Sequence, residues 1–425
     1  MKPGSVELTA GGTRIPCLQA KETVRYLGVS FSHAGRPKAD LVVLKDAIQR
    51  LNICPLKGIQ KVSVLKQNII PKVLFPWSLS VCSLETMRQG DRFVRAAVRR
   101  WLKLPDCTLS GFIHAKRGGL KVPRLEDVVP RRQLATIDRL QSSGDPAVRA
   151  CAGDWAKERR RWERTLRIAQ SDKTSLQRVK SRQCGRIERK IDESVQGLGH
   201  KLLRKQGNMP LLEAAWRRKT HRLSEYLKLV TNQLPTLEAL GRAIRGPKPL
   251  NCRLCGAARE SNLHILQECS GLRGPIVSRH NRVVDWLYNK LSRRKRVTVF
   301  REREWRDNQG RMRPDLVVKI RNRAYILDVA ICYEAGNSWE ERRVAKEAKY
   351  KRLAALVRED LGVEEAEVKG LVFGSRGAVP GPTIQTLREL GFSRKALTSV
   401  QFQIVADSLW AFREFRRRCQ GWPVP

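Results

Sequence analysis

Two aspartates, Asp315 and Asp328, have the types and spacing of residues that could share a metal ion. Each lies beside or within an apolar run rich in β-branched residues, and a short polar segment separates the two runs. This pattern predicts a β-hairpin. A tight turn at Arg321 and Asn322 would place the carboxylates opposite each other, with roughly 5 Å between their Cβ atoms. Like charges so close are destabilising unless a cation neutralises them, and hard oxygen ligands suit Mg²⁺ or Mn²⁺.

The segment after the hairpin has the pattern of a helix that carries lysines. Ser338 and Glu341 fit a capping box at its start. Lys346 lies on the apolar face, from which it could reach along the surface to a metal site and stabilise the charge on a phosphate. Lys349 is the alternative if the helical register is shifted. Tyr350 would pack against the lysine and orient it.

These residues together form the parts of a metal-dependent phosphodiesterase core. A bound metal would lower the pKa of a water molecule and neutralise the scissile phosphate. Glu334 lies six residues beyond Asp328, on the same face of an extended strand, and is a weaker third carboxylate. The alternative is a surface hairpin whose aspartates merely lie at strand ends. The lysine helix, the cysteine cluster and the positive charge of the chain favour the catalytic interpretation.

A second cluster has the spacing of a zinc site. Cys252, Cys255, His264 and Cys269 follow the pattern C-x2-C-x8-H-x4-C, and Gly256 allows a tight turn after the first pair. Such a ligand set completes a tetrahedral structural site with no open position for catalysis. The alternative is a set of core cysteines with a core histidine, but the other cysteines do not cluster. Zinc would stabilise a small unit that has little core of its own.

The composition indicates a partner that is a polyanion. The 425 residues include 84 Lys and Arg against 41 Asp and Glu, a net charge of +43, so nucleic acid is expected. Hydrophobic residues make up 41% of the chain, which excludes a wholly disordered basic tail. The longest uncharged apolar run, 73–84, has 12 residues, too few to span a bilayer, so a membrane protein is excluded. The 11 cysteines, with no signal peptide pattern, favour a reducing compartment.

Periodicity predicts how these clusters are positioned. Residues 1–31 have the pattern of short strands, and residues 40–145 have the pattern of helices. Within the helical part, one helix is expected to stop before Pro71, and a strongly amphipathic one is expected from Leu84 to Leu104.

Basic side chains on the helical segments are candidate contacts with nucleic acid. Arginines with few acidic neighbours suit phosphates, and a tryptophan among arginines can stack on unpaired bases. The alternatives are a solvated basic face, and tryptophans that anchor thin helices to a neighbour. The candidate residues are Arg88, Arg92, Arg95, Arg99, Arg159, Arg160, Arg161 and Trp162.

These motifs, in this order, resemble the C-terminal half of non-LTR retrotransposon polyproteins. The most similar type is the site-specific one with a restriction-enzyme-like endonuclease, as in elements that insert into ribosomal RNA genes, and the resemblance covers nearly the whole chain. The matching segments are Tyr26–Val29, which resembles the end of a reverse transcriptase palm; Trp101–Pro105 and Gly118–Pro123, the thumb; Asn232–Thr236, a linker motif implicated in holding nucleic acid; the cysteine and histidine cluster, the zinc knuckle; and Arg313–Asp315, Asp328 and Lys346–Tyr350, the endonuclease.

The resemblance implies a multidomain protein. It would have an α-helical thumb and linker, a small zinc knuckle and a C-terminal α/β restriction-endonuclease-like domain with a central mixed sheet. The expected domains are a palm remnant (1–31), the thumb (32–145), a basic linker (146–250), the knuckle (251–275) and the endonuclease (276–425).

The resemblance also implies a function and its partners. The expected reaction is metal-dependent nicking of target DNA in the nucleus, leaving a 3′-hydroxyl that primes reverse transcription of the element RNA. Structural Zn²⁺ and catalytic Mg²⁺ or Mn²⁺ are the implied cofactors. A polymerase usually needs an adjacent Asp-Asp pair, which the sequence lacks, so its palm core is expected to lie before Met1. The alternative function is a non-catalytic, nucleic-acid-binding relic of such a protein.

Overall fold

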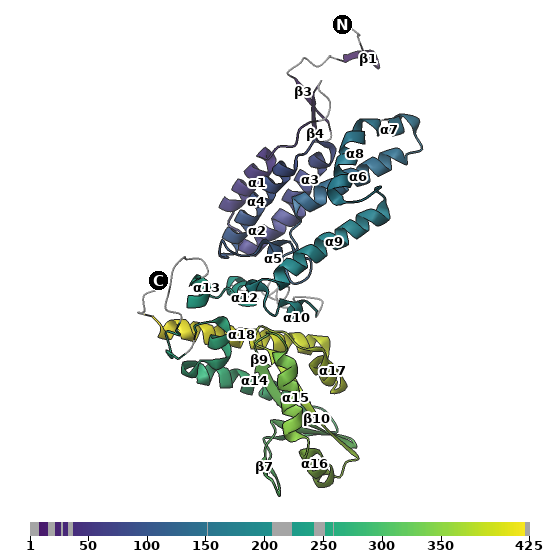
Figure 1. Cartoon of the computed structure of the whole chain (residues 1–425). Coiled ribbons are helices and arrows are strands. Elements are labelled where there is room, and N and C mark those ends of the chain that lie inside the picture. Colours follow the sequence, from purple (N-terminus) through teal and green to yellow (C-terminus); the bar gives the residue numbers. More distant parts are fainter. Residues whose placement is uncertain are drawn as a thin grey trace. The chain divides into compact units, whose positions relative to one another are not determined.

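The computed structural model is mostly helical and divides into two compact units. It describes residues 8–15, 22–26, 29–32, 37–150, 152–205, 223–241, 251–257 and 259–420 (Figure 1). The first unit comprises residues 1–103 and 121–187, and the second comprises residues 104–120 and 188–425. None of the described helices is long and apolar enough to cross a membrane. The expected five-part division of the chain stays a prediction.

The first unit begins with short strands, as predicted. Leu27 and Gly28 of the palm-like segment lie outside the described residues, as do 206–222 and 242–250 of the expected linker. Two antiparallel pairs form, β1 (Leu8–Ala10) with β2 (Thr13–Ile15) and β3 (Thr23–Tyr26) with β4 (Val29–Ser32).

Helices make up the rest of the first unit. The stripe of α4 is buried at Met87, Val94 and Val98, as the periodicity predicts. The elements are α1 (Val42–Ile53), α2 (Gly58–Val64), η1 (Leu65–Ile69), α3 (Ile70–Leu79), α4 (Leu84–Trp101), α6 (Leu125–Gln141), α7 (Pro146–Ala150), η2 (Gly153–Trp155), α8 (Ala156–Leu166) and α9 (Lys173–Asp192), the last of which continues into the second unit.

The expectation that a helix stops before Pro71 is wrong. The turn just before this proline is a π-helix, η1, in which the Ile70 N–H donates to the Leu65 carbonyl. A π-turn is wider than an α-turn and gives room for a ring that would otherwise clash with the preceding turn. The helical path therefore continues through α3 to Leu79.

The second unit contains a mixed four-stranded sheet in the order β10-β9-β8-β5. Strands β9 and β10 are parallel, and the other pairs are antiparallel. Its elements are α5 (Ser110–His114), η3 (Val195–Gly197), α10 (His200–Lys205), α12 (Leu223–Val230), α13 (Leu237–Gly241), η4 (His264–Glu268), η5 (Ser270–Leu272), α14 (Arg273–Leu291), β5 (Val297–Arg301), β6 (Trp305–Asp307), β7 (Gly310–Met312), β8 (Leu316–Ile320), β9 (Arg323–Cys332), α15 (Ser338–Tyr350), α16 (Leu353–Leu361), β10 (Glu365–Gly374), α17 (Gly381–Glu389) and α18 (Arg394–Arg418).

Successive residues of a strand point to opposite sides of the sheet, so each strand contributes to two cores, one on each face. On one face, Leu327 and Val329 pack with apolar residues of α14, α17 and α18. On the other face, Ile326 packs with Tyr350 and Leu353 of α15 and α16. The sheet is therefore the middle layer of three. Asp328 lies between Leu327 and Val329 in the strand, so its side chain points to the opposite face, which α15 covers.

The start of α15 differs from the predicted capping box. The N-cap residue is Asn337, and its side chain makes no capping hydrogen bond. The Ser338 hydroxyl instead donates to the Tyr333 carbonyl at 2.7 Å. The helix also ends at Tyr350, so the lysine-bearing segment and the one after it are two helices, α15 and α16.

Candidate active site

The β8–β9 hairpin has the register that brings the two aspartates together. Leu316 pairs with Leu327 and Ile320 with Arg323, as a two-residue turn requires. The next position along this ladder places Asp315 opposite Asp328. Asp328 is 3% exposed, and its Oδ2 atom forms an ion pair with Nζ of Lys346 on α15. The predicted lysine therefore reaches the predicted aspartate.

Asp315 is held by two groups at the end of the ladder. Its Oδ2 atom accepts the backbone N–H of Val329 at 2.7 Å. Asp315 precedes the first residue of strand β8, so this hydrogen bond forms just beyond the end of the ladder. Nε2 of His280, on α14, lies 3.3 Å from the same oxygen and 3.1 Å from the Val329 carbonyl oxygen. His280 thus fixes the carboxylate from α14, which lies on the face of the sheet opposite to α15.

The two carboxyl groups have different electrostatic environments. Burial raises the pKa of Asp328, and the negative charge of Asp315 raises it further against the opposing effect of Lys346. Burial would also raise the pKa of Asp315, but the hydrogen bonds from His280 and Val329 outweigh it and hold that pKa below its usual value. The same contact with Asp315 raises the pKa of His280 to about 8. Opposed shifts in neighbouring acids are typical of functional sites.

The donor set fits a divalent cation such as Mg²⁺. Oδ2 of Asp328 is buried and has no well-aligned hydrogen bond, although it lies against Lys346. In the described part of the chain, Oδ1 of Asp315 has no hydrogen-bond partner, since the contacts of this side chain go to Oδ2. Carboxylate oxygens left open in this way are the ligands that a hard cation prefers.

Lys349 and Tyr350 border the site, and burial together with the neighbouring charge of Asp328 raises the pKa of Tyr350. The Lys349 ammonium donates to the Tyr350 hydroxyl at 2.9 Å, and that hydroxyl donates to the Arg313 carbonyl at 2.9 Å. The Tyr350 ring is buried in the core between the sheet and its helices. Tyr350 therefore fixes α15 to the start of β8, and the lysine that its hydroxyl contacts is Lys349, whereas Lys346 makes the contact with Asp328.

The structure does not bring Glu334 to the aspartates, which corrects its interpretation as a third carboxylate. Strand β9 ends at Cys332, so strand periodicity no longer applies at this residue. Its Oε2 atom lies 3.0 Å from Nε of Arg376, in an ion pair whose side chains are both fully buried. Its Oε1 atom accepts the Arg376 backbone N–H at 2.9 Å. Glu334 thus serves the packing of the second unit.

His280 was not identified by the sequence patterns. It belongs to α14, whose buried residues include Val283, Val284 and Leu287, and nothing in its spacing relates it to a hairpin further along the chain. Only the packing of α14 across the sheet brings it to Asp315. A histidine beside an apolar helical stripe is the one signal that the sequence offers.

The predicted zinc ligands converge. The ligand atoms of Cys252, Cys255, His264 and Cys269 all lie within 4.8 Å of one another. Nε2 of His264 is 3.2 Å from Sγ of Cys255, and the turn closes through the Gly256 N–H, which donates to the Cys252 carbonyl at 2.7 Å. Burial, with Cys252 nearby, raises the pKa of Cys269 to about 12, so its thiol stays protonated unless a cation binds. The set fits structural Zn²⁺.

A buried carboxylate links this cluster to the neighbouring chain. Glu260 is fully buried, and its Oε1 atom lies 2.7 Å from Arg253, the residue after the first ligand. The same Oε1 atom accepts the backbone N–H of Leu237, at the start of α13, at 2.8 Å. The zinc-type loop is therefore tied to α13 within the second unit.

The linker motif Asn232–Thr236 is buried except at Pro235. Oδ1 of Asn232 accepts hydrogen bonds from Asn262 at 2.7 Å and from the Tyr333 hydroxyl at 2.8 Å. Oε1 of Gln233 accepts the Thr108 hydroxyl at 2.9 Å. These two side chains join the zinc-type loop, the sheet and the segment 104–120 of the second unit.

Two of the predicted nucleic-acid contacts are internal. Trp162 is 0% exposed, and its indole N–H donates to Gln133, so its interpretation as a base-stacking residue is wrong. Buried aromatic rings cannot reach a base. Arg159 lies 2.7 Å from Asp138 and 3.0 Å from Glu163, an arrangement that uses its charge within the fold.

The other predicted arginines are more accessible. Arg88 and Arg92 are exposed on α4 and form surface ion pairs with Glu126 and Glu85, contacts that are worth little in water. Arg160 is also exposed. These three remain candidates for phosphate contact.

Three further arginines are half-buried. Arg95 interacts with the buried Asp91. Arg161 lies 4.3 Å above the Trp162 ring and donates to a backbone carbonyl. Arg99 also has intermediate exposure.

Known proteins with similar sequences are polyproteins of one kind of mobile element. The chain is 25% identical over 96% of its length to the retrovirus-related Pol polyprotein from type-1 retrotransposable element R2 of Nasonia vitripennis. It is 26% identical over 95% of its length to the Pol polyprotein from type-2 element R2DM of Drosophila melanogaster. A Pol polyprotein from an R2 element of Popillia japonica is 26% identical over 96% of the chain.

These alignments cover different shares of the relatives. The chain spans 39% of the Nasonia protein, 38% of the Drosophila protein and 84% of the Popillia sequence. No family model matches the chain. The similarity extends through both units, and it confirms the resemblance to which the motifs pointed.

Proposed function

We propose that this chain, a relative of the Pol polyproteins of R2-type non-LTR retrotransposons, acts as a metal-dependent DNA endonuclease. The observation that carries the proposal is the meeting of Asp315, Asp328 and Lys346 at one end of the hairpin, with His280 against Asp315. The sheet with helices on both faces supports a restriction-endonuclease-like domain. The reaction would be hydrolysis of one phosphodiester bond, leaving a 3′-hydroxyl.

Each side chain has a role that follows from its position. Asp315 and Asp328 would hold Mg²⁺ or Mn²⁺, and a bound ion activates water and neutralises phosphate charge. Lys346, paired with Asp328, would move to a phosphate oxygen when the cation takes over the carboxylate. His280 fixes the orientation of Asp315. The zinc-type loop would stabilise the same unit.

The partners follow from charge and from the relatives. A net charge of +43 suits target DNA and the RNA of a mobile element. In the proposed setting, the nicked DNA would prime reverse transcription within the nucleus. The proposal assigns RNA-directed polymerisation to no residue of this chain, because the sequence has no adjacent Asp-Asp pair.

One observation favours a non-catalytic nucleic-acid-binding relic as the second candidate. Lys346 and His280 already pair with the two aspartates. Such pairs balance the negative charge without any metal ion. A relic of this kind would bind DNA in a salt-sensitive manner and would leave a supercoiled plasmid intact in Mg²⁺ and in Mn²⁺.

The two lysines of α15 give a test that separates these functions. In a supercoiled plasmid nicking assay with Mg²⁺, Lys346→Met is expected to slow nicking on the order of 100-fold, because a group that stabilises transition-state charge is lost. Lys349→Met is the matched control and should have a much smaller effect, because its ammonium contacts Tyr350. Equal losses in both variants, or no nicking by the unaltered chain with either metal, would contradict the proposal.

A further inference from the structure

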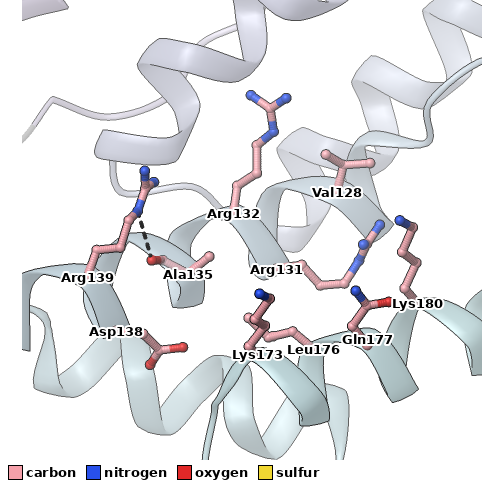
Figure 2. Close-up of a pocket in the computed structure, with 10 residues that line it drawn as sticks. All are labelled: Val128, Arg131, Arg132, Ala135, Asp138, Arg139, Lys173, Leu176, Gln177 and Lys180. Atoms are coloured by element: carbon pink, nitrogen blue, oxygen red, sulfur yellow. Dashed lines mark hydrogen bonds between the residues drawn. The ribbon is translucent and has the colours of Figure 1, made fainter. Parts of the chain in front are cut away.

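The first unit has a basic cavity that is separate from the candidate active site and from the zinc-type cluster. It lies between α6 and α9 and has a volume of about 580 Å³ (Figure 2). Its lining includes the cationic side chains Arg131, Arg132, Arg139, Lys173 and Lys180. Figure 2 shows that these side chains come from both helices.

The positive charge of this cavity is not balanced by its own lining. Asp138 is the one acidic residue among the lining residues. Its Oδ1 atom is already taken by Arg159 at 2.7 Å and by the Ser171 hydroxyl at 2.6 Å. The cavity therefore attracts an anion from solution.

Three of the cations have no partner within the part of the chain that is described. Lys173, Lys180 and Arg132 form no hydrogen bond or ion pair there, and all are exposed. The other two have partners within the fold: Arg131 donates to the carbonyl of residue 127 and interacts with the carboxylate of the same residue, and Arg139 donates to the carbonyl of residue 135. Arg132, Lys173 and Lys180 are thus open to an external ligand, and the other two add positive charge to the same cavity.

The cations are spaced along the cavity in two rows. Arg132 and Arg139 are seven residues apart on α6, and Lys173 and Lys180 are seven apart on α9. Seven residues span two turns, or about 10 Å along a helix. Charges repeated in this way on both walls match a ligand that is itself a chain of anions.

The other lining residues indicate which part of such an anionic chain the cavity would contact. Val128, Ala135 and Leu176 provide an apolar surface, and the lining contains no aromatic ring. Unstacked bases are usually held by aromatic side chains. The cavity therefore suits the sugar-phosphate backbone and not the base edges.

We propose that the cavity between α6 and α9 binds one strand of nucleic acid through its phosphates, without preference for base sequence. A single strand can lie with one backbone between two rows of cations. A duplex, whose two backbones are held apart across grooves of about 6 and 12 Å, presents only one of them to such a cavity. Strands of RNA and DNA share the phosphate chemistry, and both are included in the test.

Lysine acetylation of the full chain, followed by mass spectrometry, tests the location. Oligouridylate and oligothymidylate of twelve nucleotides are expected to protect Lys173 and Lys180 from acetylation. Lys72 and Lys157, exposed in the same unit but not among the residues that line the cavity, should react as before. Equal protection of all four lysines would mean diffuse binding and would overturn the proposal.

Affinity measurements test the phosphate contacts. In the double variant Lys173→Gln, Lys180→Gln, the slope of log K against log salt concentration should become about 1.4 less steep, since each single-strand phosphate contact contributes about 0.7. Binding at 0.1 M salt should be roughly 25-fold weaker than that of the unaltered protein. Lys72→Gln with Lys157→Gln removes the same charge and should have a smaller effect. Equal losses would overturn the site. A duplex that protects Lys173 and Lys180 as well as a strand does would overturn the single-strand assignment.

Discussion

Asp328→Asn is expected to reduce plasmid nicking by at least about 100-fold in Mg²⁺, while leaving the fold intact. Asparagine has nearly the same shape, but it carries no charge and is a poorer ligand for a hard cation. Changes to groups that merely support a metal ligand cost about 10–100-fold, so loss of a ligand should cost more. Because Asp328 is buried beside Asp315, the substitution also removes a like-charge repulsion, and thermal stability should not fall sharply.

Asp285→Asn provides the control for this variant. Asp285 is a half-exposed carboxylate of the same unit, and it pairs with Arg301 at the surface. Its loss should leave nicking close to that of the unaltered protein, because exposed ion pairs contribute little. If Asp328→Asn nicked DNA as fast as Asp285→Asn, Asp328 would have no place in the mechanism.

Loss of the zinc-type cluster is expected to have the largest effect on stability. Structural Zn²⁺ contributes about 10–16 kcal/mol of apparent binding free energy in small zinc modules, and this binding is coupled to folding. Cys252→Ser or Cys269→Ser removes a ligand that is almost fully buried. We expect the protein to lose its bound zinc, measured as metal per chain by atomic absorption, and to unfold at a lower temperature.

Cys184→Ser is the matched control for the cluster. Cys184 is a free cysteine of intermediate exposure on α9, outside the ligand set. This variant should keep one zinc ion per chain and the original melting temperature. Equal zinc content in the Cys269→Ser and Cys184→Ser proteins would mean that the cluster does not bind zinc.

Local patterns were sufficient to predict the hairpin and the cysteine cluster. The register around Asp315 and Asp328 is set by a turn within the same short segment, so alternation of apolar residues fixes it. The ligands from Cys252 to Cys269 are also close in sequence, and a tight turn brings the first pair together. Lys346 follows on the next helix, for which helical periodicity defines the face.

Features that depend on packing between distant segments could not be predicted. His280 reaches Asp315 only because α14 crosses the far side of the sheet. Glu334 forms an ion pair with Arg376, which follows strand β10 in the chain, and no local pattern indicates that pairing. Trp162 looks like a surface residue among arginines, but its contact with a buried glutamine places it in the core. Composition alone gives no information about such contacts.

Titration of the zinc-loaded chain with Mn²⁺, followed by electron paramagnetic resonance of the free ion, tests the central claim most directly. The account predicts one Mn²⁺ bound per chain, displaced by Mg²⁺ and absent when Asp315→Asn and Asp328→Asn are combined. Equal Mn²⁺ binding by the unaltered and doubly substituted proteins, or no binding by either, would contradict the claim that these two carboxylates hold a shared ion.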